Sequence, residues 1–172
     1  MRQPSPTFGD VFTSGQLSRI PDLEDADLDE RFPIQEVSTG LPCIVVPLKN
    51  LESLKRCRVH IDTYYDLISA MQAKAILAFS PEPYDKADLS ARFFADYYGV
   101  PEDPATGSAN GCLAAYLVKH GYFGEDSIDI RVEQGHEIGR PSLLYLRAEK
   151  REDEISVFVG GKVQMVARGE LL

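Results

Sequence analysis

Short apolar runs separated by glycine and proline dominate the pattern of the chain, and such runs are typical of β-strands. We predict strands at residues 32–37, 43–48, 74–79, 89–97, 128–133, 142–148, 155–159 and 163–167. Gly160-Gly161-Lys162 lies between the last two strands. It predicts a tight hairpin, because glycine accepts a positive φ without steric cost.

Two segments have a helical pattern instead. Residues 61–72 place apolar side chains at the spacing of one helix face. Residues 109–118 are apolar on every face except at Asn110, which predicts a helix buried on all sides. This second helix should end at Lys119-His120-Gly121, since basic groups suit the last turn and glycine suits the position after it.

The N-terminal region has a weaker pattern. Residues 1–20 contain proline, glycine and serine, which predicts an extended arm or a first strand, and the acidic residues 21–31 predict a solvated loop with one helical turn. A chain of 172 residues favours a single domain, here residues 1–172. The runs of strands then predict an α+β fold, in which a curved, mostly antiparallel sheet wraps around one buried central helix.

Composition narrows the classes of partner. A net charge of −9 argues against nucleic acid and disfavours anionic membrane surfaces. Apolar runs stay shorter than the ~18 residues that a membrane span needs. Cys43, Cys57 and Cys112 are widely spaced, which predicts free thiols and a cytoplasmic location. The three histidines lack metal-ligand spacing, so we predict no metal site.

The residues that open the buried helix carry the candidate chemistry. Asp103-Pro104 fits an N-cap followed by proline, whereas Thr106 could cap a helix that starts at Gly107, and both assignments stay open. Gly107 and Ser108 leave the backbone N–H groups of the helix start uncovered, which predicts a site for an anion such as a substrate carboxylate. Asp103 could exchange a proton there, although an Asp-Pro cap is commonly only structural.

Longer motifs then carry a resemblance. Residues 102–109 (EDPATGSA) and 113–117 (LAAYL) resemble the signature of the PhzF-like family of phenazine biosynthesis, which shares the diaminopimelate-epimerase fold. Further motifs match in the family's order, at residues 38–42, 133–135, 139–142 and 159–163. Even residues 1–6 resemble the strand that leads into the family's second domain, so the resemblance covers the whole chain.

The resemblance implies a site and a reaction. Family members have two similar domains, and both central helices point their N-termini into the cleft between them. The chain resembles the C-terminal domain, which implies that Asp103 and Ser108 are catalytic and that Thr106, Gly107 and Ser108 bind the substrate. His136 is a further candidate for substrate contact, or else a surface-loop histidine. The implied reaction is a proton-shift isomerisation of a small cyclic or aromatic carboxylate, without metal, flavin, nicotinamide or pyridoxal cofactor.

One family feature is missing. The family's principal acid/base is a glutamate of the first domain, near a Gly-His pair, and this sequence has no match to it. We therefore expect half of an active site, inactive without a separately encoded N-terminal domain or a second copy in a homo-oligomer. The alternative is a non-catalytic module that binds a small molecule or homodimerises, or the remnant of a truncated enzyme. A Cys-Cys racemase is disfavoured, because no cysteine opens the helix.

Overall fold

A computed structural model describes residues 1–17 and 23–170. Its strands are β1 (Thr7–Phe12), β2 (Ile34–Ser38), β3 (Pro42–Pro47), β4 (Ala75–Ser80), β5 (Leu89–Ala95), β6 (Val100–Asp103), β7 (Ser127–Gln134), β8 (Ser142–Arg151) and β9 (Glu154–Gly161). Its helices are α1 (Ser14–Leu17), α2 (Leu51–Arg56), α3 (Ile61–Ile68) and α4 (Gly107–Lys119), with 3-10 turns η1 (Asp25–Asp27) and η2 (Asp96–Tyr98).

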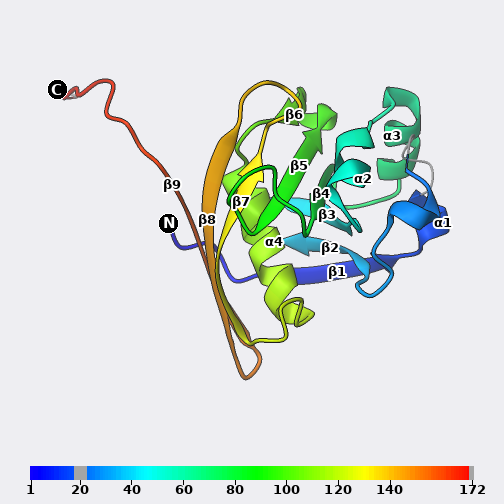
Figure 1. Cartoon of the computed structure of the whole chain (residues 1–172), viewed down its shortest axis with the longest axis horizontal. Coiled ribbons are helices and arrows are strands. Elements are labelled where there is room, and N and C mark those ends of the chain that lie inside the picture. Colours follow the sequence, from blue (N-terminus) through cyan, green and yellow to red (C-terminus); the bar gives the residue numbers. More distant parts are fainter. Residues whose placement is uncertain (18–22, 171–172) are drawn as a thin grey trace.

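The strands form one curled sheet in the order β1-β2-β3-β4-β5-β7-β8-β9, and β6 pairs with β5 beside this path. Neighbours are antiparallel except for β3 with β4 and β5 with β7. Figure 1 shows the sheet curving around α4, with α2 and α3 on its outer side. This arrangement confirms the predicted α+β class, a curved and mostly antiparallel sheet around one central helix.

Helix α4 is buried as its sequence predicts. Every residue from Ala109 to Val118 is buried, and their apolar side chains join the main core with those of the surrounding strands. The hydroxyl of Tyr116 donates to the carbonyl of Pro33 at 2.6 Å, which satisfies the polar end of a buried ring. A second core lies between the outer face of the sheet and helices α2 and α3.

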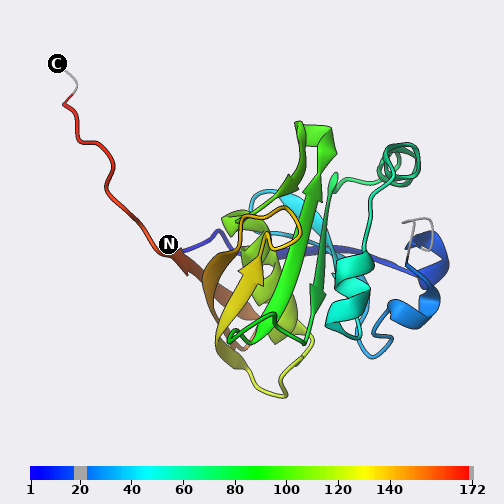
Figure 2. The same ribbon diagram turned by 45° about the horizontal axis from the view of Figure 1, so that its top comes forward.

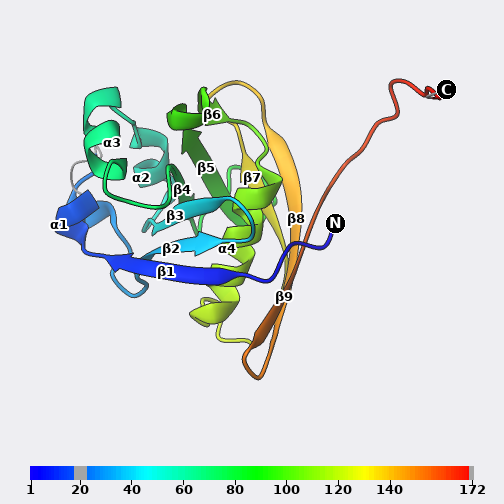
Figure 3. The same ribbon diagram turned by 180° about the vertical axis from the view of Figure 1, so that it is seen from behind.

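Residues 1–3 pair with β9, the last strand of the curled sheet. The amide of Gln3 donates to the carbonyl of Val157, and the amide of Val159 donates to the carbonyl of Met1, each at 2.9 Å. Arg2 thereby lies opposite Phe158 of β9, although β1, a few residues on, forms the far edge of the sheet. Figure 3 shows this N-terminal segment passing from β9 to β1 across the back of the molecule.

The predicted hairpin at Gly160-Gly161-Lys162 is wrong. Both glycines belong to β9, where Gly160 pairs with Tyr145 and Gly161 with Leu144 of β8. The chain turns instead before β9, where Glu152 has a φ of 53°. Two glycines suit a turn locally, but pairing with the long strand β8 overrides that preference.

The predicted strand at 163–167 is also wrong. Residues 162–170 form no strand within the described chain, and the side chains of Val163 and Met165 are 95% and 80% exposed. Figure 2 shows this segment, which we call the C-terminal tail (residues 162–170), leaving the fold after β9. A strand needs a neighbour for its backbone groups, and this segment leaves the sheet before it meets one.

Other boundaries moved by a few residues. The helix expected at 61–72 ends at Ile68, and the strand expected at 89–97 ends at Ala95, where η2 begins. Residues 7–12 form a strand and residues 25–27 the single helical turn, while residues 18–22 lie outside the described residues. Among the described helices, none has the length and apolar character needed to cross a membrane.

Candidate functional site

Helix α4 begins at Gly107, with Thr106 as its N-cap residue. The side chain of Thr106 does not cap the helix, because its hydroxyl donates to Oδ2 of Asp103 instead. The N–H groups of the first turn therefore receive no side-chain cap, and with the helix dipole they remain suited to an anion. Of the two cap assignments that the sequence left open, the structure selects Thr106 over Asp103.

The amide of Gln134, at the end of β7, holds this helix start together. Its oxygen accepts from the side chain of Asn110 at 2.8 Å and from the backbone N–H of Thr106 at 3.4 Å. Its nitrogen donates to the carbonyl of Asp103 at 2.6 Å and to the hydroxyl of Thr106 at 3.1 Å. Gln134 is 1% exposed, so these four bonds satisfy a fully buried amide.

Beside the helix start lies a cavity of about 770 Å³. Ala105 and Gly107 line it from the helix side. The rest of the wall comes from Met1, Pro141, β8, β9 and the first residues of the tail, including Gly161 and Lys162. The volume matches that of small-molecule sites in proteins. Lys162 adds a positive charge to the field of the helix dipole, so the cavity favours an anionic guest.

The structure joins some of the predicted site residues and separates another. Asp103 and Thr106 are hydrogen-bonded, and Gly107 lines the cavity. Ser108 follows in the first turn, where its carbonyl accepts from the hydroxyl of Thr39 at 3.2 Å. His136 makes its own contacts elsewhere, so its place in a substrate site stays a prediction.

His136 belongs to a neighbouring cluster. Its ring stacks on that of Tyr84 with centroids 4.0 Å apart, and its Nε2 lies 4.0 Å from Oε2 of Glu133. The hydroxyl of Tyr84 donates to Glu137. Burial, and then this hydrogen bond, raise the pKa of Tyr84, so the phenol keeps the proton that it donates to Glu137.

Arg92 connects that cluster to the helix start. The guanidinium is 4% exposed and binds Glu102 through two bonds, at 2.9 Å from Nε and 2.8 Å from Nη2. It also donates to the carbonyl of Cys57 at 2.7 Å. Burial lowers the pKa of Arg92, but Glu102 and Glu137 outweigh burial and raise the pKa overall, so the guanidinium stays charged. Because Glu102 precedes Asp103 in the chain, this ion pair fixes the backbone that leads to the start of α4.

The sequence pattern does not predict the polar residues that lie against helix α4. Gln134 belongs to the motif at residues 133–135, but no local pattern predicts that Gln134, Gln3 or Thr39 lies against α4. A Cβ atom at Gly111 would lie 2.9 Å from Oγ1 of Thr39 and 3.0 Å from Cγ of Gln3. Glycine at that position therefore lets both side chains approach the helix, and a glycine within an apolar helix was the available signal.

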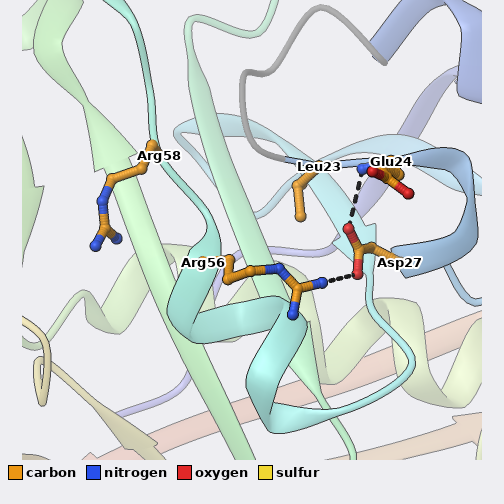
Figure 4. A pocket seen from close by; sticks show the side chains of 5 residues that line it. All are labelled: Leu23, Glu24, Asp27, Arg56 and Arg58. Atoms are coloured by element: carbon orange, nitrogen blue, oxygen red, sulfur yellow. Dashed lines mark hydrogen bonds and ion pairs between the residues drawn. The ribbon is translucent and has the colours of Figure 1, made fainter.

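A second cavity, of about 640 Å³, lies on the outer side of the sheet near α2. Figure 4 shows Asp27 in its wall, bonded to Arg56 and to the backbone of Glu24. Ser53 also donates to Asp27, at 2.7 Å. Burial raises the pKa of Asp27, but these bonds outweigh it and lower the pKa overall. The carboxylate thus fastens η1 to α2, and we assign no site to this cavity.

The thiols of Cys43 and Cys57 are unsuited to catalysis. Cys43, Cys57 and Cys112 are free and buried. Burial raises the pKa of Cys57 to about 12, and a hydrogen bond with Cys112, together with burial, raises that of Cys43. Thiols that stay protonated are poor nucleophiles and poor metal ligands. A hydrogen bond with Cys43 lowers the pKa of Cys112 instead, but that thiol is fully buried. Within the described residues no group of three or more His, Cys, Asp and Glu side chains is arranged to hold a metal ion.

Comparison with known proteins gives consistent matches. Residues 1–169 match the family model PhzC-PhzF, described as phenazine biosynthesis-like protein. The chain is 34% identical to a trans-2,3-dihydro-3-hydroxyanthranilate isomerase of Pseudomonas chlororaphis, over 100% of the chain and 58% of that protein. It is 30% identical to an uncharacterized isomerase of Clostridium acetobutylicum, over 100% of the chain and 59% of that protein.

Solved structures agree. A Bacillus anthracis phenazine biosynthesis protein of the PhzF family superposes with a TM-score of 0.82 at 30% identity, covering 94% of this chain and 56% of that one. A predicted epimerase from Pseudomonas aeruginosa gives a TM-score of 0.76 at 32% identity, covering 100% and 57%. The chain thus spans less than three fifths of the length of each of these relatives.

Proposed function

Because the chain belongs to the PhzC-PhzF family of phenazine biosynthesis-like isomerases, we propose that it supplies half of an isomerase active site. The reaction would be a proton shift on a small cyclic or aromatic carboxylate. The observation that carries this proposal is the start of α4, where uncapped backbone N–H groups and Lys162 adjoin one cavity and Asp103 stands hydrogen-bonded beside them.

Each part of the helix start has a role in this proposal. The N–H groups of Gly107 and Ser108 bind the substrate carboxylate, since a helix N-terminus attracts negative charge. Asp103 takes or returns a proton, and the hydroxyl of Ser108 contacts the substrate beside it. His136, in the loop that follows β7, would make a further contact with the substrate.

A second protein part completes the site in this proposal. The relatives are longer than this chain, and the one from Pseudomonas chlororaphis is named for a reaction on a cyclic amino-carboxylate. We propose that a separately encoded N-terminal domain, or a second copy of the chain, supplies the principal acid/base. We place the complex in the cytoplasm, where the free thiols would stay reduced.

A binding experiment tests the anion site directly. Benzoate is titrated into 15N-labelled protein, and the amide resonances of Gly107 and Ser108 are followed, with neutral benzamide as the matched ligand. We expect benzoate to move these resonances and benzamide to leave them unmoved. Gly107→Pro removes one N–H and should weaken benzoate binding about tenfold, the effect of losing one charge-assisted hydrogen bond. Equal responses to both ligands would refute the anion site.

A non-catalytic, homodimerising module is the second candidate, and the tail favours it. Val163, Met165 and Val166 are between 80% and 95% exposed on a segment that leaves the fold. Exposed apolar side chains of this kind drive association. Sedimentation analysis of the wild type and of a Val163→Ser, Met165→Ser variant decides the matter. A dimer that the substitutions dissociate supports the module, and a monomer at micromolar concentration speaks against it.

A further inference from the structure

The direction of each hydrogen bond around Gln134 follows from its neighbours. Its Oε1 faces two obligate donors, the side-chain nitrogen of Asn110 and the backbone N–H of Thr106. Its Nε2 faces an obligate acceptor, the carbonyl of Asp103. A flipped amide would set donor against donor and acceptor against acceptor, so only one orientation is possible.

That orientation also fixes the hydroxyl of Thr106. The second N–H of Gln134 Nε2 points to Oγ1 of Thr106, so this oxygen acts as an acceptor there. The hydroxyl proton of Thr106 must then be used elsewhere, and the structure directs it to Oδ2 of Asp103. Within the described residues the other carboxylate oxygen, Oδ1, carries no hydrogen bond.

We infer that Gln134 is a positioning residue for Asp103, acting through the hydroxyl of Thr106. The amide orients Thr106 as a donor, Thr106 holds Oδ2, and Oδ1 is the oxygen left to meet a guest and exchange a proton with it. The nitrogen that orients Thr106 also holds the carbonyl of Asp103, so the carboxylate and its own backbone are fixed by one side chain. The purpose of this arrangement rests on the proposed function, while the arrangement itself can be tested without it.

The test compares isosteric substitutions. Gln134→Glu keeps the acceptor used by Asn110 but removes both donors, so the hydroxyl of Thr106 turns from Asp103 to the new carboxylate. Thr106→Val removes the hydroxyl and keeps the shape. Gln35→Glu is the matched control, because Gln35 is also a buried glutamine of this sheet, bonded to the carbonyl of Gly9 at 3.1 Å.

The readout is the 13C resonance of the Asp103 side-chain carboxyl carbon in protein labelled at aspartate. We expect it to shift in Gln134→Glu and in Thr106→Val, to shift by less than the sum of the two single shifts when both are combined, and to stay in place in Gln35→Glu. Shifts that simply add would mean that Gln134 does not act through Thr106, and would overturn the inference. So would a resonance that moves in Thr106→Val but not in Gln134→Glu.

A second variant and a second measurement complete the experiment. If Gln134→Glu fails to fold because its charge is buried, Gln134→Met removes the same donors without a charge, and the same shift of the Asp103 resonance is expected. Benzoate is added to each sample while the amides of Gly107 and Ser108 are recorded. Amides that ignore benzoate count against the proposed function, whereas the Asp103 resonance alone decides the role of Gln134.

Discussion

The side chains of Gln134 and Asn110 meet at 2.8 Å, and this contact joins the end of β7 to the first turn of α4. Asn110 is fully buried, and its nitrogen also donates to the carbonyl of Thr106 at 3.0 Å. A single amide therefore serves both the strand and the helix that border the candidate site.

Replacing Asn110 should cost stability. Asn110→Ala leaves the oxygen of Gln134 with one donor fewer in a buried place, and we expect a loss of about 1–3 kcal/mol in the free energy of unfolding. Urea denaturation measures it. Ser90→Ala is the matched control, because within the described structure the buried hydroxyl of Ser90 has no hydrogen-bond partner. That variant should be neutral or stabilising, and equal losses in the two variants would contradict the prediction.

Gly135 should tolerate no side chain. It has a φ of +85°, and an added Cβ would lie 2.5 Å from the carbonyl oxygen of Arg140 and 2.9 Å from Pro104. Gly135→Ala must therefore move the backbone next to Asp103, and we expect a large fall in melting temperature. Gly139→Ala shares the positive φ, but nothing lies within 4 Å of its Cβ. Gly139→Ala should lose only the cost of a left-handed backbone for alanine, about 1–2 kcal/mol in the free energy of unfolding. Similar melting temperatures for Gly135→Ala and Gly139→Ala would refute the steric argument.

Arg92 should be far more costly to remove than a surface arginine. Arg92→Met leaves Glu102 without its partner in a nearly buried position, which costs about 3–5 kcal/mol. Arg147→Met is the control, because Arg147 pairs with Asp129 at 2.9 Å while both side chains are more than 60% exposed. Pairs of that kind contribute about 0–1 kcal/mol. Chemical denaturation of both variants gives the comparison, and a cost for Arg92→Met below about 1 kcal/mol would contradict it.

Stability should fall when the pH drops below about 6.5, the ordinary pKa of histidine. Burial, and then Lys119, lower the pKa of His120, whose Nε2 lies 2.8 Å from the side-chain oxygen of Gln35. The unfolded chain then binds a proton at a higher pH than the folded one. The neutral His120 therefore makes its full contribution to the free energy of unfolding above pH 6.5. That contribution is lost as the pH falls toward the lowered pKa of the folded state.

Urea denaturation at pH 7.5 and pH 5.0 checks this sign. The wild type should lose stability between the two values, and His120→Gln should lose less. His60→Gln, at an exposed position, should keep the slope of the wild type. Asp27 and Asp29 do not interfere, because their pKa values are lowered and their contributions are lost only below about pH 4. An unchanged slope in His120→Gln would contradict the prediction.

The sequence predicted the central helix well because its signal is local. Ten consecutive buried residues from Ala109 to Val118 leave α4 little choice but the core, and the motif at its start carries the candidate chemistry. The end of β9 could not be predicted in this way. Gly160 and Gly161 suit a turn by themselves, and only the register with β8 makes them a strand.

The polar contacts of the site could not be predicted from the sequence for a related reason. Gln134 lies 28 residues from Thr106 and 24 from Asn110 along the chain, so no short spacing connects them. The parallel pairing of β5 with β7, which sets Gln134 opposite Ala91, helps to bring the end of β7 to the helix start. Long-range pairing decides such contacts, and a local pattern does not contain it.

The pairing of residues 1–3 with β9 makes the succession of strands circular. Met1 and Val159 are hydrogen-bonded neighbours, so the first and last parts of the folded body meet along one edge. A short flexible linker from Lys162 to Met1 could therefore replace the tail, and the chain could be opened instead at the exposed turn around Glu152. Such a circular permutant would keep every strand pairing described for the sheet. The fold therefore depends on which strands pair with each other, and the chain could begin at more than one of the turns between them.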